Sequence, residues 1–145
     1  MDIQELSDKL EITELLHRYA RAVDTRDWSL WRSVFTDDAR VDYSSTPHGR
    51  SGSRDEIADW LSANFEFIPT SQHFITNIES SIDGDVAEVR ALFYNPIQLP
   101  GTEGLSFCGG NYHHELVRTG TGWKSRKLVE ENLWFFNNPF EHPTS

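Results

Sequence analysis

The chain has 145 residues, a formal net charge of −10, 12% aromatic residues and one cysteine. An acidic surface repels the phosphate backbone of nucleic acids and anionic membranes, so neither is an expected partner. A single cysteine excludes an internal disulfide, and the absence of a leader-like N-terminus or an apolar run of 18 residues favours a cytoplasmic protein. The length fits one domain, residues 1–145.

The first half of the chain predicts three helices. Apolar residues recur at helical spacing over residues 3–24, with charged residues on the other side. Asp27 can cap a second, shorter helix. Ser53 and Glu56 form a capping box ahead of a third helix, which we expect to end near Phe67.

Strand patterns occupy most of the rest of the chain. Residues 39–45 alternate as a half-buried strand does, and residues 46–53 carry the glycine, proline and serine of a loop. The other predicted strands are residues 73–82, 86–99, 105–119 and 123–136. We expect residues 136–145 to form an irregular tail.

Helices followed by strands predict an α+β domain, in which three N-terminal helices pack on a strongly curved mixed or antiparallel sheet. A sheet folded around a long helix leaves a cone-shaped cavity, which is a natural site for a small molecule. The sequence has no glycine-rich nucleotide motif, no HExxH and no GxSxG. We therefore expect no cofactor and no resident metal.

His73 lies within the strand pattern of "SQHFITN", on the face that also carries Asn77. Asp24 ends the first helix, at the negative end of its dipole, where a carboxylate needs compensation. An imidazole bound to it through Nδ1 would have a fixed tautomer and could act as a general acid or base. The spacing alone favours a surface histidine without a role at position 73, and it is equally compatible with an exposed turn aspartate at position 24.

Tyr19 on the helical stripe and Tyr43 on the first strand could each aim a hydroxyl into the cavity or belong to the core. His113 and His114 are neighbours on a strand, so at most one of them faces inward. Either could formally join Asp24 and His73 around a metal, although we do not expect one. The candidates for substrate binding are Val23, Trp28, Asn77, Tyr112, His113 and His114.

Four stretches occur together and in order: "LLHRYARAVDTRDWSLWRSVFTDDARVDYS", "DEIADWL", "QHFITN" and "GGNYHHELVRTGTGWK". They resemble the SnoaL-like or scytalone dehydratase-like branch of the nuclear transport factor 2-like superfamily. The resemblance implies a cone-shaped α+β barrel, a homo-oligomer of two or three subunits, and a cofactor-free site.

In that branch an Asp–His pair eliminates water with the help of two tyrosines, and the resemblance places the pair at Asp24 and His73. Tyr43 matches one tyrosine, whereas Val23 stands where the other is expected. Tyr19 matches a tyrosine of a related dehydratase of the branch.

The residues and the resemblance together suggest a dehydratase-like lyase for a small cyclic or aromatic substrate with a carbonyl group. His73, oriented by Asp24, would remove a proton from the carbon beside the carbonyl, which Tyr43 and Tyr19 would polarise. Two alternatives remain open. One is a ketosteroid isomerase-like or polyketide cyclase-like proton transfer, and the other is a non-catalytic module that binds small molecules.

Overall fold

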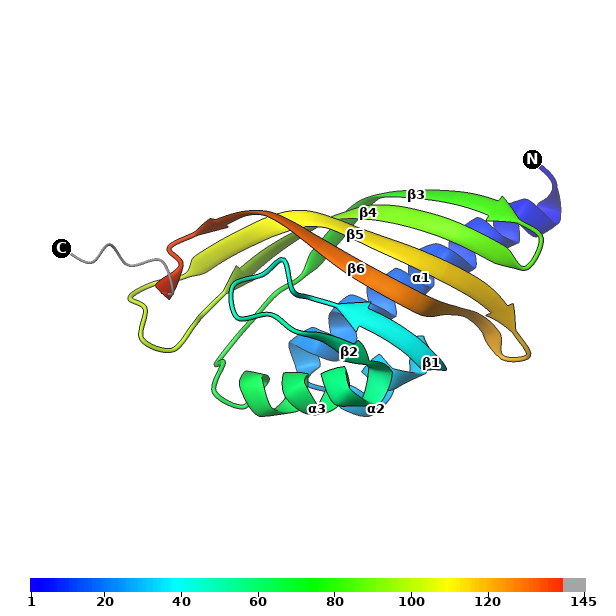
Figure 1. Cartoon of the computed structure of the whole chain (residues 1–145). Coiled ribbons are helices and arrows are strands. Elements are labelled where there is room, and N and C mark those ends of the chain that lie inside the picture. The colour runs from blue at the N-terminus through cyan, green and yellow to red at the C-terminus, as the bar shows by residue number, and fades with distance from the viewer. Residues whose placement is uncertain (140–145) are drawn as a thin grey trace.

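A computed structural model of the protein describes residues 1–139, which form three helices and one six-stranded sheet. The elements are α1 (Ile3–Thr25), α2 (Trp28–Ser33), β1 (Phe35–Asp42), β2 (Ser51–Ser53), α3 (Arg54–Phe65), β3 (Phe74–Asp83), β4 (Val86–Ile97), β5 (Ser106–Thr119) and β6 (Gly122–Phe136). The strand order is β2-β1-β6-β5-β4-β3. The long strands curl over α1, while α2 and α3 lie beside β1 and β2 at one edge of the sheet (Figure 1).

The sheet is mixed: β1 runs parallel to β6, and every other pair of neighbouring strands in the sheet is antiparallel. This arrangement confirms the predicted α+β fold with helices on a curved sheet. The pairing joins a strand from the first third of the chain to the last strand.

The long first helix forms as its apolar spacing predicts. Asp2 caps α1 by accepting a hydrogen bond from the backbone N–H of Glu5. The stripe on the inner side of α1, each member no more than 2% exposed, consists of Ile12, Leu15, Leu16, Tyr19 and Val23. Ser53 caps α3 as expected, through the backbone N–H of Glu56, and α3 ends at Phe65 rather than near Phe67.

Two boundaries differ from the prediction. The strand β1 begins at Phe35, and not at residue 39, because Phe35 pairs with Ser125 and the backbone N–H of Ser125 donates to the carbonyl of Val34 at 2.9 Å. Residues 46–53 are not all loop, since Ser51–Ser53 form the short strand β2 against the end of β1. Such a short edge strand is specified by its partner and not by its own composition.

Glycines in β5 allow close packing against β6. A Cβ atom at Gly109 would overlap the ring of Trp134, and one at Gly110 would overlap the backbone carbonyl of Glu131. The register between the two strands shifts at this point, as in a β-bulge, and bulges bend a sheet.

No helix within residues 1–139 combines the length and the apolar character that a membrane span requires. The predicted tail starts at Phe136, which is the last residue of β6. Residues 140–145 of that tail lie outside the described part of the chain.

Candidate active site

A cavity of about 500 Å³ with a mainly apolar lining is a suitable size for a small organic ligand. Its walls come from α1, the segment after β1, α3 and the segment after it, and strands β4 to β6. The lining residues are Tyr19, Val23, Tyr43, Thr46, Pro47, His48, Trp60, Leu61, Ala63, Asn64, Phe65, Phe67, Ile68, His73, Phe93, Asn95, Ile97, Leu99, Pro100, Cys108, Tyr112, Glu130, Phe135 and Pro139.

Asp24 and His73 are in direct contact. Nδ1 of His73 lies 2.6 Å from Oδ1 of Asp24, and the backbone N–H of His73 donates to Oδ2 at 2.7 Å. Ser71 donates its hydroxyl proton to Oδ1 at 3.1 Å. The His73 side chain is 7% exposed and lines the cavity, whereas Asp24, 20% exposed, lies behind it.

The contacts of Asp24 determine its ionisation. Burial opposes the charged form of this carboxyl, but the hydrogen bonds and charge of His73 and the hydroxyl of Ser71 outweigh burial and lower the pKa of Asp24. Asp24 is therefore a carboxylate at neutral pH, and it fixes the orientation of the imidazole.

The end of α1 and the start of β3 bring this pair together. Arg26 adopts a left-handed conformation with φ of 57°, which ends the helix just after Asp24. Its guanidinium donates to the carbonyls of Asp24 and Ile68. Ser71 and Gln72 are attached to the end of β4, so His73 is held against the helix terminus.

Asn95, on the cavity face of β4, contacts the other nitrogen of His73. We assign its amide orientation from the neighbouring backbone: the amide nitrogen donates to the carbonyls of Pro96 and Gln72 at 3.1 and 3.3 Å. The amide oxygen then lies 3.2 Å from Nε2 of His73 and can accept a proton bound there.

Tyrosine hydroxyls form a second polar group in the cavity. The hydroxyls of Tyr19 and Tyr43 lie 2.5 Å apart, and the ring of Tyr112 packs edge-on against Tyr19 with centroids 5.3 Å apart. Burial raises the pKa of each of the three phenols well above the ordinary value. They are neutral hydrogen-bond donors at physiological pH.

The predicted position of Asn77 is wrong. The strand β3 begins at Phe74, after His73, and its register shifts between Thr76 and Glu79. Asn77 lies in this bulge with φ of 51° and is exposed, so it does not share the cavity with His73. The extra residue reverses the alternation of inner and outer side chains that the prediction assumed.

Trp28 is also not among the residues that line the cavity. Its ring packs against Phe65, with centroids 5.8 Å apart, and Phe65 occupies the wall in its place. Val23 and Tyr112 lie in the lining as expected.

His113 and His114 point to opposite sides of β5, as the strand geometry requires, and neither lines the apolar cavity. Nε2 of His113 pairs with Glu131 at 3.0 Å on the outer face. His114 is buried in the core, where its Nδ1 bonds to the hydroxyl of Ser125 at 2.9 Å. Within residues 1–139, no three His, Cys, Asp or Glu side chains are gathered to hold a metal ion.

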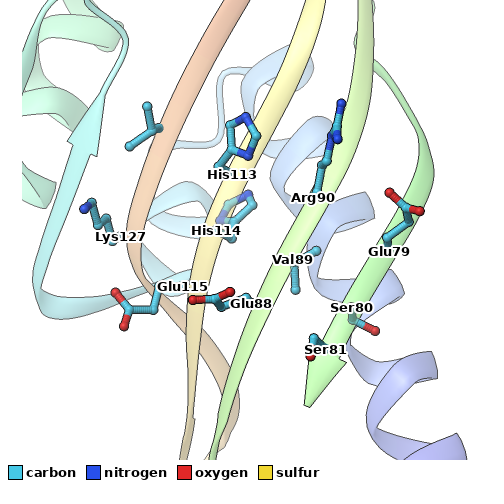
Figure 2. A pocket seen from close by; sticks show the side chains of 11 residues that line it. Glu79, Ser80, Ser81, Glu88, Val89, Arg90, His113, His114, Glu115 and Lys127 are labelled. Atoms are coloured by element: carbon cyan, nitrogen blue, oxygen red, sulfur yellow. The ribbon is translucent and has the colours of Figure 1, made fainter. Parts of the chain in front are cut away.

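A second hollow, of about 550 Å³, lies over β3 to β6. Figure 2 shows the side chains that line it along the strands, with α1 behind the sheet. It is open and carries charges of both signs, among them Glu79, Glu88, Arg90, Glu115 and Lys127. The Asp24–His73 pair and the tyrosines are absent from its lining, so the apolar cavity is the candidate active site.

Sequence reasoning missed Ser71, Asn95 and Glu130. Asn95 and Glu130 could have been found from strand alternation. Asn95 follows Phe93 on the buried parity of β4, and Glu130 follows Leu128 on that of β6, so each is a polar residue at an inward position. Ser71 precedes β3 and carries no comparable signal.

Comparisons with known proteins show which family and which fold the chain resembles. Residues 4–129 match the family model described as SnoaL-like domain. The uncharacterized protein Rv2910c of Mycobacterium tuberculosis is 36% identical over 131 residues, which are 90% of this chain and 88% of that protein.

Two solved structures share the fold. One is a candidate scytalone dehydratase from Novosphingobium aromaticivorans, with a TM-score of 0.84, 18% identity and coverage of 95% and 92% of the two chains. The other is the hexachlorocyclohexane dehydrochlorinase LinA-type3 from Novosphingobium barchaimii, with a TM-score of 0.80, 21% identity and coverage of 100% and 99%.

Proposed function

The chain belongs to the SnoaL-like domain family, and on that premise we propose that it is a dehydratase-type lyase that works without a cofactor. Its substrate would be a small cyclic or aromatic molecule with a carbonyl group and a hydroxyl on the second carbon from it. Fold relatives named as a dehydratase and a dehydrochlorinase support an elimination reaction. The apolar, aromatic-rich cavity supports the substrate class.

The observation that carries the proposal is the contact of 2.6 Å between Nδ1 of His73 and the Asp24 carboxylate. A carboxylate there keeps the proton on Nδ1, which leaves Nε2 of a neutral imidazole with a lone pair. His73 lines the cavity, and we infer that a bound substrate reaches this nitrogen beside the amide of Asn95. His73 is then the general base.

In the first step, Nε2 of His73 takes the proton from the carbon beside the carbonyl. The imidazole becomes positively charged, and it donates to Asp24 through Nδ1 and to the amide oxygen of Asn95 through Nε2. The Asn95 contact is favourable only after the proton has arrived, so it stabilises the charge that forms during the reaction.

The negative charge from the broken C–H bond moves to the carbonyl oxygen. The neutral hydroxyl of Tyr43 would donate a hydrogen bond to that oxygen, and the hydroxyl of Tyr19 would donate to Tyr43. The enolate then expels the hydroxyl, which leaves as water once it gains a proton, and a conjugated enone remains. General base and oxygen stabilisation each supply a factor of roughly 10²–10⁴, which suits an activated α-proton.

The test is the appearance of enone absorbance from cyclic β-hydroxy ketones, beginning with β-hydroxycyclohexanone. We expect His73→Ala to lower kcat by about 10³-fold. The matched control is His17→Ala, because His17 is an exposed histidine on α1. Turnover that survives in His73→Ala would contradict the proposal, as would an isomerised product formed without loss of water. Tight binding without turnover in the wild type would instead indicate a binding module.

A further inference from the structure

Glu130 is the one carboxylic acid among the described residues that line the cavity. It lies on β6 directly opposite Tyr112 of β5 and follows the buried Leu128 on the same face of the strand. The described lining contains no lysine and no arginine. Glu130 therefore has no lysine or arginine beside it in the described cavity wall, and the mechanism described above does not use it.

The surroundings of Glu130 disfavour its charged form. The groups that act on it or face it are Tyr19 from α1, Asp42 from β1, Tyr43, and Tyr112 and Cys108 from β5. Burial has the largest effect and the negative charge of Asp42 the next largest, and together they raise the pKa of Glu130 to about 8. The carboxyl is thus mostly protonated at neutral pH.

The segment after β1 holds this carboxyl in place. The hydroxyl of Thr46 donates to Oε1 of Glu130. Ser45 donates to the backbone carbonyl of Glu130 at 2.6 Å and accepts from the backbone N–H of Asn132 at 2.9 Å. With Oε1 acting as an acceptor, Oε2 is the oxygen left to carry the acidic proton.

We propose that Glu130 holds a proton in the resting cavity and donates it to an oxygen atom of an uncharged ligand, on the wall opposite His73. The strand order places β6 three strands from β3, about 14 Å along a flat sheet. Both side chains line the same cavity of about 500 Å³, so one small ligand can lie between them.

The role in the reaction rests on the proposed function. When the enolate expels its hydroxyl, the C–O bond breaks and the departing oxygen takes the proton of Glu130, so water leaves. His73 then carries the proton from the substrate carbon, and Glu130 is a carboxylate. A water molecule entering as the product departs returns the proton from His73 to Glu130, which restores both groups. No oxidant or other co-reactant is needed.

The same arrangement selects the charge of the ligand. A carboxylate or phosphate ligand would find no cationic lysine or arginine in the described lining, and a protonated carboxyl offers a hydrogen bond to a neutral oxygen. We therefore expect uncharged ketones to bind best at neutral pH. Cationic amines should gain affinity only where Glu130 ionises.

The first experiment detects the proton without any turnover. Infrared difference spectra between about pH 6 and about pH 9.5 should contain a band for a protonated carboxylic acid in the wild type and in Glu131→Gln. Glu131 is the matched control, because it is the adjacent residue on β6 and pairs with His113 on the outer face. The band should be missing in Glu130→Gln, and its presence there, or its absence in the wild type, would overturn the proposal.

The second experiment measures binding of three fluorescent probes with one ring system: acetylnaphthalene, naphthoate and naphthylmethylammonium. We expect the neutral ketone to bind the wild type most tightly at neutral pH. Glu130→Ala should weaken it about five- to tenfold, while Glu130→Gln, which keeps a donor, retains affinity. Equal affinity for naphthoate, or no effect of Glu130→Ala, would contradict the proposal.

The third experiment uses β-hydroxycyclohexanone. Glu130→Gln should lower kcat by about 10²-fold and should remove the loss of activity that the wild type undergoes as pH rises through about 8. A wild-type loss retained in Glu130→Gln would overturn the donor role. If the wild type has no turnover at all, the dehydratase proposal fails, and the infrared and probe results still decide whether Glu130 holds the proton.

Discussion

Replacement of Asp24 by Asn is the sharpest test of the Asp–His pair, because the structure predicts where the amide nitrogen will lie. Oδ2 faces the backbone N–H of His73, which cannot turn away. Oδ1 faces Nδ1 of His73 and the hydroxyl of Ser71, both of which can exchange donor and acceptor roles. The amide nitrogen therefore takes the Oδ1 position and donates to Nδ1.

The substitution then moves the imidazole proton from Nδ1 to Nε2. In that tautomer Nε2 donates to the amide oxygen of Asn95, so every polar atom of the cluster has a partner while the base is blocked. The comparable change in a serine protease triad costs about 10⁴ in kcat. We expect about 10³–10⁴ here.

The effect on folding should be much smaller than the effect on catalysis. The three hydrogen bonds to the charged carboxylate become neutral ones in a site that is 20% exposed, so the free energy of unfolding should fall by about 1–2 kcal/mol. Folding lowers the pKa of Asp24, so the charged carboxylate stabilises the fold at any pH above the ordinary pKa of a carboxyl. This stabilisation is lost as the pH falls through the lowered pKa of the folded protein. The difference in stability between wild type and variant should therefore shrink in acid.

Two assays read this prediction independently. Two-bond ¹H–¹⁵N correlation spectra report which ring nitrogen of His73 carries the proton, and they need no substrate. Enone formation reports kcat. The control is Asp59→Asn, since Asp59 lies on α3 with its side chain 82% exposed. Finding the wild-type tautomer in Asp24→Asn, or undiminished turnover, would refute the reasoning.

Three further predictions concern neighbouring features. Asn95→Ala should lower kcat about tenfold and leave the His73 tautomer unchanged, because it removes one hydrogen bond to the charged imidazole; a variant as active as wild type would exclude that role. Gly110→Ala should lower the free energy of unfolding by about 3 kcal/mol in urea denaturation, because the new Cβ overlaps the Glu131 carbonyl. The control is Gly120→Ala, where the space around the new Cβ is open and the free energy of unfolding should change by about 0.5 kcal/mol or less. Burial, with a smaller contribution from the charge of His113, lowers the pKa of His114 to about 3. As the pH falls, this histidine is therefore protonated in the unfolded chain before it is protonated in the folded protein. The stability that the neutral ring contributes is present above about pH 6.5 and is lost as the pH falls toward 3. Thermal unfolding at about pH 7 and about pH 4.5 should therefore show a smaller loss of Tm in His114→Phe than in wild type, and equal losses would contradict the assignment.

The parts of the fold that follow from local rules could be predicted from the sequence. The stripe from Ile12 to Val23 and the cap at Ser53 are set by residues a few positions apart. The strand β2 and the early start of β1 are set by a partner far along the chain, which no local pattern contains. The bulge at Asn77 is likewise a property of two strands together.

The candidate site divides in the same way. The dipole argument for Asp24 required a partner without identifying it, and the family resemblance supplied His73, 2.6 Å away in the structure. Asn95 and Glu130 stand at inward positions of strands, but the sequence reasoning looked for histidines and tyrosines, and the partners of both residues come from other elements. Alternation alone predicts that such side chains point inward and cannot predict what they meet.

The parallel pairing of β1 with β6 has a consequence for synthesis on the ribosome. A nascent chain that has released α1, β1 and α3 still lacks the strand between β1 and β5, because β6 follows all the other described elements in the sequence. Until β6 is made, β1 pairs only with β2, and the hydroxyl of Thr46 lacks the Glu130 carboxyl to which it donates in the folded protein. Contacts between such distant residues make folding slow and leave an unfinished sheet edge exposed. The cavity therefore forms only after β6 has been made, and a truncation within β6 should yield a chain without a binding site.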